Sequence, residues 1–151
     1  MRWGDRPVWV RCVAGAYVIG FLEGTGAHAY FLATGGLQAY GYAPMPVQLL
    51  FHALLLLDLL VALLIVRARP GGALLAAVVM LLDLAGNWDC TWHAVLADPV
   101  AYLRPAGLLP ITVFGIFVVF TALPLRRGLA NAEAPGDDHR HRPDAPHASI
   151  G

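Results

Sequence analysis

The stretch from Pro46 to Val66, PVQLLFHALLLLDLLVALLIV, decides the fold of this chain. As a helix it is long enough to cross a hydrocarbon layer about 30 Å thick, because roughly 20 mostly apolar residues suffice. Three further stretches have the same character: Val8 to Leu32, Gly72 to Trp92 and Pro105 to Leu125. The sequence therefore predicts an all-α fold, an integral membrane bundle of four transmembrane helices.

Composition supports a membrane protein with a single domain. Apolar residues make up 58% of the 151 residues and charged residues only 13%, whereas soluble proteins carry about 25% charged residues. Residues 1–127 form the transmembrane domain. Residues 128–151 form a polar tail without apolar periodicity, which predicts disorder. Its Asp-Asp-His-Arg-His run either holds a metal weakly or is simply solvated.

The positions of the basic residues predict that both termini are cytoplasmic. Arginines flank the start of the first span, the connection between the second and third spans, and the end of the fourth, whereas residues 33–45 have none. The chain has no lysine and is rich in Ala, Leu, Gly and Arg, which suggests a GC-rich bacterium and hence its inner or plasma membrane. A cleaved signal peptide is the alternative for the first span, but the apolar stretch is long and contains Glu23.

Ionisable side chains inside the spans mark the candidate functional site. Charged groups are costly in hydrocarbon, so a functional role is the default hypothesis for them. A rise of about 1.5 Å per residue places them in two layers. The deeper layer holds Asp58 and Asp83 near the midplane. The upper layer, in the outer half, holds Glu23, His52 and Asn87, with His28, Asp89, Cys90 and His93 above it.

The segment from Asp83 to His93, DLAGNWDCTWH, is the densest polar run in any span. Asp83 and Asn87 share one helix face, and Asp89 and His93 form a second i, i+4 pair on another face. A carboxylate and an imidazole at this spacing can ligate a metal. Trp88 and Trp92, however, are typical of the headgroup level, so Asp89 and His93 are alternatively wet interfacial residues.

Structural interpretations compete with chemical ones for Glu23, Asp83 and His52, and His52 is alternatively a core histidine with its hydrogen bonds satisfied. A desolvated carboxyl group favours its neutral form, and Glu23 or Asp83 would then only bond a neighbouring helix. Gly20 and Gly24 form a GxxxG element, which predicts either tight packing around Glu23 or a gap through which a substrate reaches it. The loop TGGLQAYGYAPMP either covers that gap as a lid or is an ordinary connector.

Several features together resemble the DoxX-like small four-helix membrane proteins. They are Arg11 opening the first span, Gly26-Ala27-His28, Pro44 closing the loop, Arg67-Ala68-Arg69-Pro70, and an Ala-rich third span with Met80. The resemblance covers residues 8 to 125 in layout. It implies a four-helix bundle, often a membrane partner of redox systems connected to the quinone pool. His28 stands where a basic residue often ends the family's first span.

Three functions remain open on the sequence. The favoured one is a membrane-embedded enzyme, or enzyme subunit, that uses carboxylate and histidine acid-base chemistry on a lipid-soluble quinone or isoprenoid. Its expected catalytic residues are Glu23, His52, Asp83 and Asn87, and its expected substrate-binding residues are His28, Asp58, Trp88, Asp89 and His93.

The alternatives are a small proton-coupled transporter, which needs an oligomer, and a non-catalytic assembly subunit. A transporter needs polar access from both faces, yet the second and third spans carry no polar group between the two deeper acids and Arg67. The bilayer is the expected partner, with a homo-oligomer or a membrane redox protein as further candidates. No basic patch indicates nucleic-acid binding, and neither a cofactor nor a metal is specified.

Overall fold

Helices are the only regular structure in residues 3–102 and 107–131, the part of the chain that the computed structural model describes. Four are long and apolar enough to cross a membrane: α1 (Val8–Gly35), α2 (Met45–Val66), α3 (Pro70–Ala97) and α5 (Leu108–Ala130). Three short elements accompany them: η1 (Trp3–Asp5), η2 (Gly36–Gln38) and α4 (Pro99–Tyr102). The predicted four-helix all-α bundle is confirmed. The predicted disordered tail lies, apart from its first few residues, outside the described part.

Proline and glycine set the helix boundaries. Pro46 and Pro70 stand in the first turns of α2 and α3, where a missing backbone N–H costs nothing. Gly36, at φ 58°, ends α1 because its backbone enters the left-handed region that glycine tolerates. α3 continues to Ala97, beyond the predicted end at Trp92. α5 extends to Ala130, beyond the predicted end at Leu125, and its predicted start at Pro105 lies outside the described residues.

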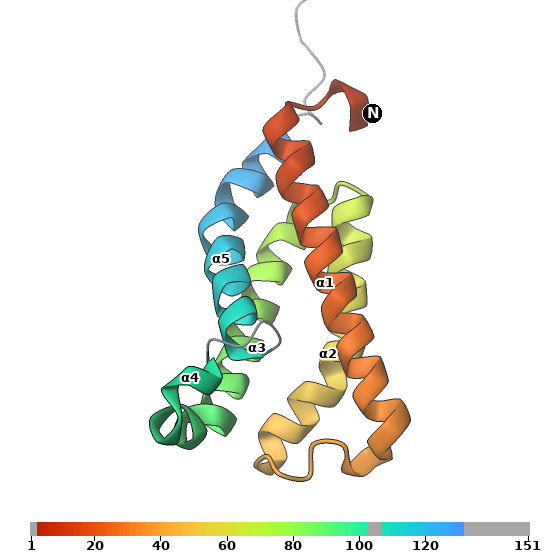
Figure 1. Ribbon diagram of the computed structural model, residues 1–151. Helices are drawn as coiled ribbons and strands as arrows, with labels where there is room; N and C mark the ends of the chain where they lie inside the picture. The colour runs from red at the N-terminus through yellow and green to blue at the C-terminus, as the bar shows by residue number, and fades with distance from the viewer. Residues whose placement is uncertain (1–2, 103–106, 132–151) are drawn as a thin grey trace, which may run out of the picture.

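The long helices pack as two pairs that join through α2 and α3. α1 lies along α2, α3 lies along α5, and contacts between α1 and α5 are fewer. The start of α1 and the end of α5 meet at one end of the bundle, called here the basic end, whereas η2 and α4 lie at the other, the loop end (Figure 1). The described arginines at the basic end are Arg6, Arg11, Arg67, Arg69, Arg126 and Arg127. The membrane face that each end meets stays a prediction.

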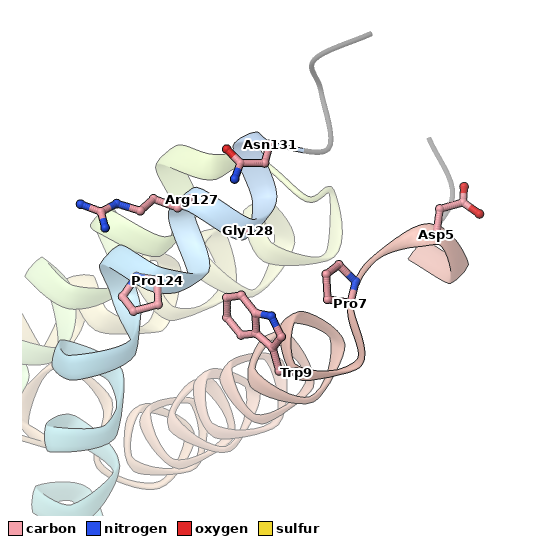
Figure 2. A pocket seen from close by; sticks show the side chains of 7 residues that line it. All are labelled: Asp5, Pro7, Trp9, Pro124, Arg127, Gly128 and Asn131. Atoms are coloured by element: carbon pink, nitrogen blue, oxygen red, sulfur yellow. The ribbon is translucent and has the colours of Figure 1, made fainter. Parts of the chain in front are cut away.

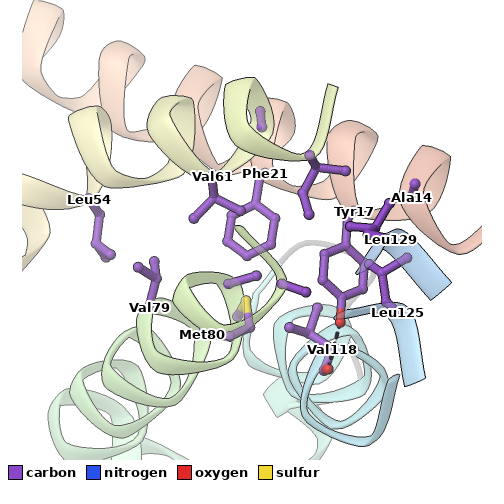
Figure 3. Packing of buried hydrophobic residues seen from close by; sticks show 14 of the residues in the cluster. Ala14, Tyr17, Phe21, Leu54, Val61, Val79, Met80, Val118, Leu125 and Leu129 are labelled. Atoms are coloured by element: carbon purple, nitrogen blue, oxygen red, sulfur yellow. Dashed lines mark hydrogen bonds between the residues drawn. The ribbon is translucent and has the colours of Figure 1, made fainter. Parts of the chain in front are cut away.

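An aromatic and aliphatic core runs through the bundle and includes most of the buried side chains towards the basic end (Figure 3). Phe21 on α1 meets Phe114 of α5 edge to face, with ring centroids 5.7 Å apart. The Tyr17 hydroxyl donates a hydrogen bond to the Val118 carbonyl at 2.7 Å and lies 3.0 Å from the Thr121 hydroxyl. The second and third spans contribute no polar group to this half, but these bonds form a polar link between α1 and α5.

The residues before α1 tie the basic end together. Trp3 Nε1 donates to the carbonyl of Val66 at the end of α2, over 2.9 Å. The buried Arg6 guanidinium donates to the Leu129 carbonyl at 3.0 Å and to the Gly128 carbonyl at 3.3 Å, and it stacks over the Trp3 ring. These bonds satisfy carbonyls that the last turns of α2 and α5 leave without helical partners. The N-terminal segment thus fixes the spacing of three helices.

Candidate functional site

Two buried carboxyl groups from neighbouring helices form the centre of the candidate site. Asp58 lies in the middle of α2 and is 4% exposed, and Asp83 lies in α3 and is 7% exposed. The two groups are close enough to interact electrostatically. The structure therefore brings together the two acids that the sequence placed at the same depth.

Asn87 holds the Asp83 carboxyl group in place. Its side-chain amide donates to Asp83 Oδ1 at 2.8 Å and to the Asp83 backbone carbonyl at 3.0 Å. This contact is the i, i+4 pairing that the spacing of the two residues predicted. No hydrogen bond to Asp58 is found within the described part of the chain, so its oxygens are free to accept a proton or a ligand donor.

A glycine on α1 makes room for Asp58. A Cβ added at Gly24 would lie 2.6 Å from Asp58 Oδ2, so a larger residue there would force the Asp58 carboxyl group to shift. One turn earlier, Gly20 seats the ring of Phe114, and a Cβ there would lie 2.2 Å from Phe114 Cζ. The GxxxG element thus serves tight packing against a carboxyl group, but that group is Asp58 and not Glu23.

Tyr40 lies in the connection between α1 and α2, and its side chain is buried in the interior of the bundle. Its side chain is 3% exposed, and its hydroxyl lies 2.7 Å from His28 Nδ1. Tyr40 also interacts electrostatically with Asp83, which extends the cluster towards the loop end. Burial raises the pKa of the Tyr40 hydroxyl to about 12, and the charges of Tyr42 and Asp83 add to this shift. Tyr40 is therefore a neutral phenol at physiological pH.

His52 borders the same cluster on α2. Its Nδ1 lies 2.6 Å from the Gln48 backbone carbonyl, and its ring meets the Tyr40 ring edge to face, with centroids 5.2 Å apart. Its Nε2 is buried and has no partner among the described residues. The candidate site thus consists of two carboxyl groups, one amide, one phenol and two imidazoles.

Glu23 lies apart from this cluster, and its expected catalytic role stays a prediction. Its side chain is exposed on α1. The interior face of α1 carries Tyr17, Phe21 and His28, which are buried or half-buried, and Gly24 packs on Asp58. One residue along a helix is a rotation of about 100°, which turns Glu23 out of the interior.

The upper predicted residues on α3 also lie apart from the cluster. Asp89 and His93 are exposed, so neither side chain contributes to the buried cluster. Trp88 is half-buried, donates from Nε1 to the Thr112 hydroxyl at 3.2 Å, and stacks with Trp92 and Tyr102. Trp88 therefore contributes to α3–α5 packing at the loop end.

Metal binding finds no support in the described residues, which contain no group of three or more His, Cys, Asp or Glu side chains placed to hold an ion. Nor is the surface hollow at the basic end part of the cluster (Figure 2). It measures about 570 Å³ and is lined by Asp5, Pro7, Trp9, Pro124, Arg127, Gly128 and Asn131. In Figure 2 the Arg127 side chain points away from Trp9.

Comparison with family models, curated proteins and solved structures finds no match to this chain. The resemblance to DoxX-like proteins accordingly stays a prediction. The functional argument rests on the geometry of the Asp58–Asp83 pair and the side chains beside it.

Proposed function

We propose that this protein is a membrane-embedded enzyme, or enzyme subunit, that exchanges protons with a lipid-soluble substrate of the quinone or isoprenoid class. The observation that carries the proposal is the Asp58–Asp83 pair, buried between α2 and α3 in helices apolar enough to span a membrane. Two buried carboxyl groups that interact electrostatically release their protons in separate steps, so one can hold a proton while the other is ionised. This is the acid-base capacity that such a reaction requires.

The polar groups beside the pair extend towards one end only. His28, Tyr40 and Asn87 lie between the pair and the loop end, whereas apolar side chains such as Phe21, Val61 and Met80 fill the bundle on the other side (Figure 3). A one-sided set of polar groups suits an enzyme that exchanges protons with one aqueous face. In this arrangement Asp83 or Asp58 is the proton donor or acceptor, and Asn87 orients Asp83.

A proton-coupled transporter is the second candidate, since paired acids near the middle of a bundle are common proton sites. It requires a polar path to the basic end. The polar side chains described in that half of the core are already bonded: the Tyr17 hydroxyl is held by Val118 and Thr121, and the buried Arg6 guanidinium is held by the Gly128 and Leu129 carbonyls. This arrangement favours the enzyme.

The proposal is tested by identifying lipid-soluble molecules that co-purify with the protein in detergent. Organic extracts of the wild type, Asp58→Asn and Asp83→Asn are compared by mass spectrometry, with metal content measured on the same samples. Glu23→Gln is the matched control, because it neutralises an exposed carboxyl group outside the cluster. We expect a quinone or isoprenoid to be retained in the control and lost in either aspartate variant. An empty wild-type protein, or equal retention in all four, would instead favour an assembly subunit.

A further inference from the structure

The His52 imidazole carries the one buried side-chain nitrogen or oxygen atom that lacks a partner among the described residues. Leaving such an atom unpaired is costly, and almost all buried polar groups in proteins are bonded. Its Nε2 therefore requires an explanation beyond packing.

The other ring nitrogen determines what Nε2 can bind. Nδ1 lies 2.6 Å from the Gln48 backbone carbonyl, and a carbonyl oxygen only accepts hydrogen bonds. Nδ1 therefore carries the proton. In the neutral ring Nε2 is then an acceptor, whose natural complement is an O–H or N–H group.

The surroundings of His52 place this acceptor beside Tyr40, which itself interacts electrostatically with Asp83. The Tyr40 ring meets His52 at 5.2 Å and Phe51 at 5.1 Å, and Tyr40 also interacts with Asp83. A ligand group bonded to Nε2 would accordingly have aromatic faces beside it and acid-base groups within the same cluster. This setting suits a flat or unsaturated apolar molecule with a hydroxyl group.

We propose that His52 Nε2 anchors the hydroxyl group of a lipid-soluble ligand, with a quinol as the representative. The proposal rests on the proposed function and names the polar contact that its substrate makes. Nε2 is closed off in this structure, so the ligand displaces a side chain when it binds. Tyr40 is the side chain suited to this, because it belongs to the connection between α1 and α2, and its movement breaks a bond to His28 without unpacking a long helix.

The test compares a short-tailed quinol with its dimethyl ether, which has the same ring but no hydroxyl donor. Binding to detergent-solubilised protein is measured under anaerobic conditions for the wild type and His52→Asn. Asparagine retains an amide group that can bond the Gln48 carbonyl but has no counterpart of Nε2. We expect the wild type to bind the quinol about tenfold more tightly than the ether, and His52→Asn to bind both alike.

Each outcome separates this proposal from the proposed function. A wild type that binds both compounds equally, or a preference that survives in His52→Asn, overturns the role of Nε2. If quinol binding then still depends on Asp83, the proposed function stands. A wild type that binds neither compound overturns the quinol as substrate and the His52 contact with it. A spectroscopic readout supplements the affinities: the nitrogen-15 resonance of His52 Nε2 should shift with the quinol and not with the ether.

Discussion

Replacing Gly24 by alanine is expected to destabilise the protein by pushing against the Asp58 carboxyl group. The added Cβ would lie 2.6 Å from Asp58 Oδ2, whereas ordinary van der Waals contact begins at 3.4 Å. Asp58 is buried between helices, so its side chain cannot retreat into open space. Overpacking of this kind costs about 1–3 kcal/mol.

Gly26→Ala is the matched control on the same helix. A Cβ at Gly26 meets nothing within 4 Å. Both substitutions gain about 0.5–1 kcal/mol from the better helix propensity of alanine. The difference in stability between Gly24→Ala and Gly26→Ala therefore isolates the contact with Asp58.

The assay is the thermal unfolding of each variant in detergent, followed by circular dichroism, in the wild-type and Asp58→Ala backgrounds. We expect Gly24→Ala to be less stable than Gly26→Ala by about 1–3 kcal/mol in the wild-type background. This difference should disappear once Asp58 is truncated, because the two sites are then uncoupled. Equal stabilities in the wild-type background, or a cost that persists without the carboxyl group, would refute the packing of Asp58 on Gly24.

Four further outcomes follow from named contacts. Tyr40 should ionise near pH 12 in a spectrophotometric titration in which Tyr40→Phe is the reference, and a transition near pH 10 would contradict its burial. Because folding raises the pKa of Tyr40 from 10.0, the wild type should also lose stability relative to Tyr40→Phe as the pH rises from 10 towards 12. Tyr17→Phe should lower stability in thermal unfolding by about 1 kcal/mol through its lost hydrogen bonds, and an unchanged melting temperature would count against them. Arg6→Met should speed amide hydrogen exchange in the last turn of α5, whereas unaltered exchange would mean that the guanidinium does not hold this end. Ala68→Gly should raise the melting temperature by an amount equivalent to about 1 kcal/mol, because Ala68 has φ 55°, in the left-handed region that is costly for a residue with a Cβ. A loss of stability would contradict strain at this position.

The long helices could be predicted from the sequence because their formation depends on local composition. Each apolar stretch is long enough to span a membrane, and a proline or glycine lies at most of the helix boundaries. The pairing of Asp83 with Asn87 was likewise predictable, since both lie on one helix at i, i+4. These features require no knowledge of which helix neighbours which.

The composition of the site was less predictable because it depends on how each helix is rotated. Depth along α1 is nearly the same for Glu23 and Gly24, yet only Gly24 faces Asp58. Tyr40 was missed as a site residue because its burial results from the path of the connection between α1 and α2, which has no periodicity to read. The signal that was present is its place in a loop with two tyrosines, for which the sequence predicted either a lid or an ordinary connector.

Infrared difference spectroscopy on addition of a quinol gives the most direct test of proton exchange at the Asp58–Asp83 pair. The proposed function predicts a change in the carbonyl stretching band of protonated carboxyl groups in the wild type and in Glu23→Gln. It also predicts that Asp58→Asn and Asp83→Asn each abolish this change. A wild-type spectrum without any carboxyl change, or a change that survives in both aspartate variants, would contradict the role of the pair.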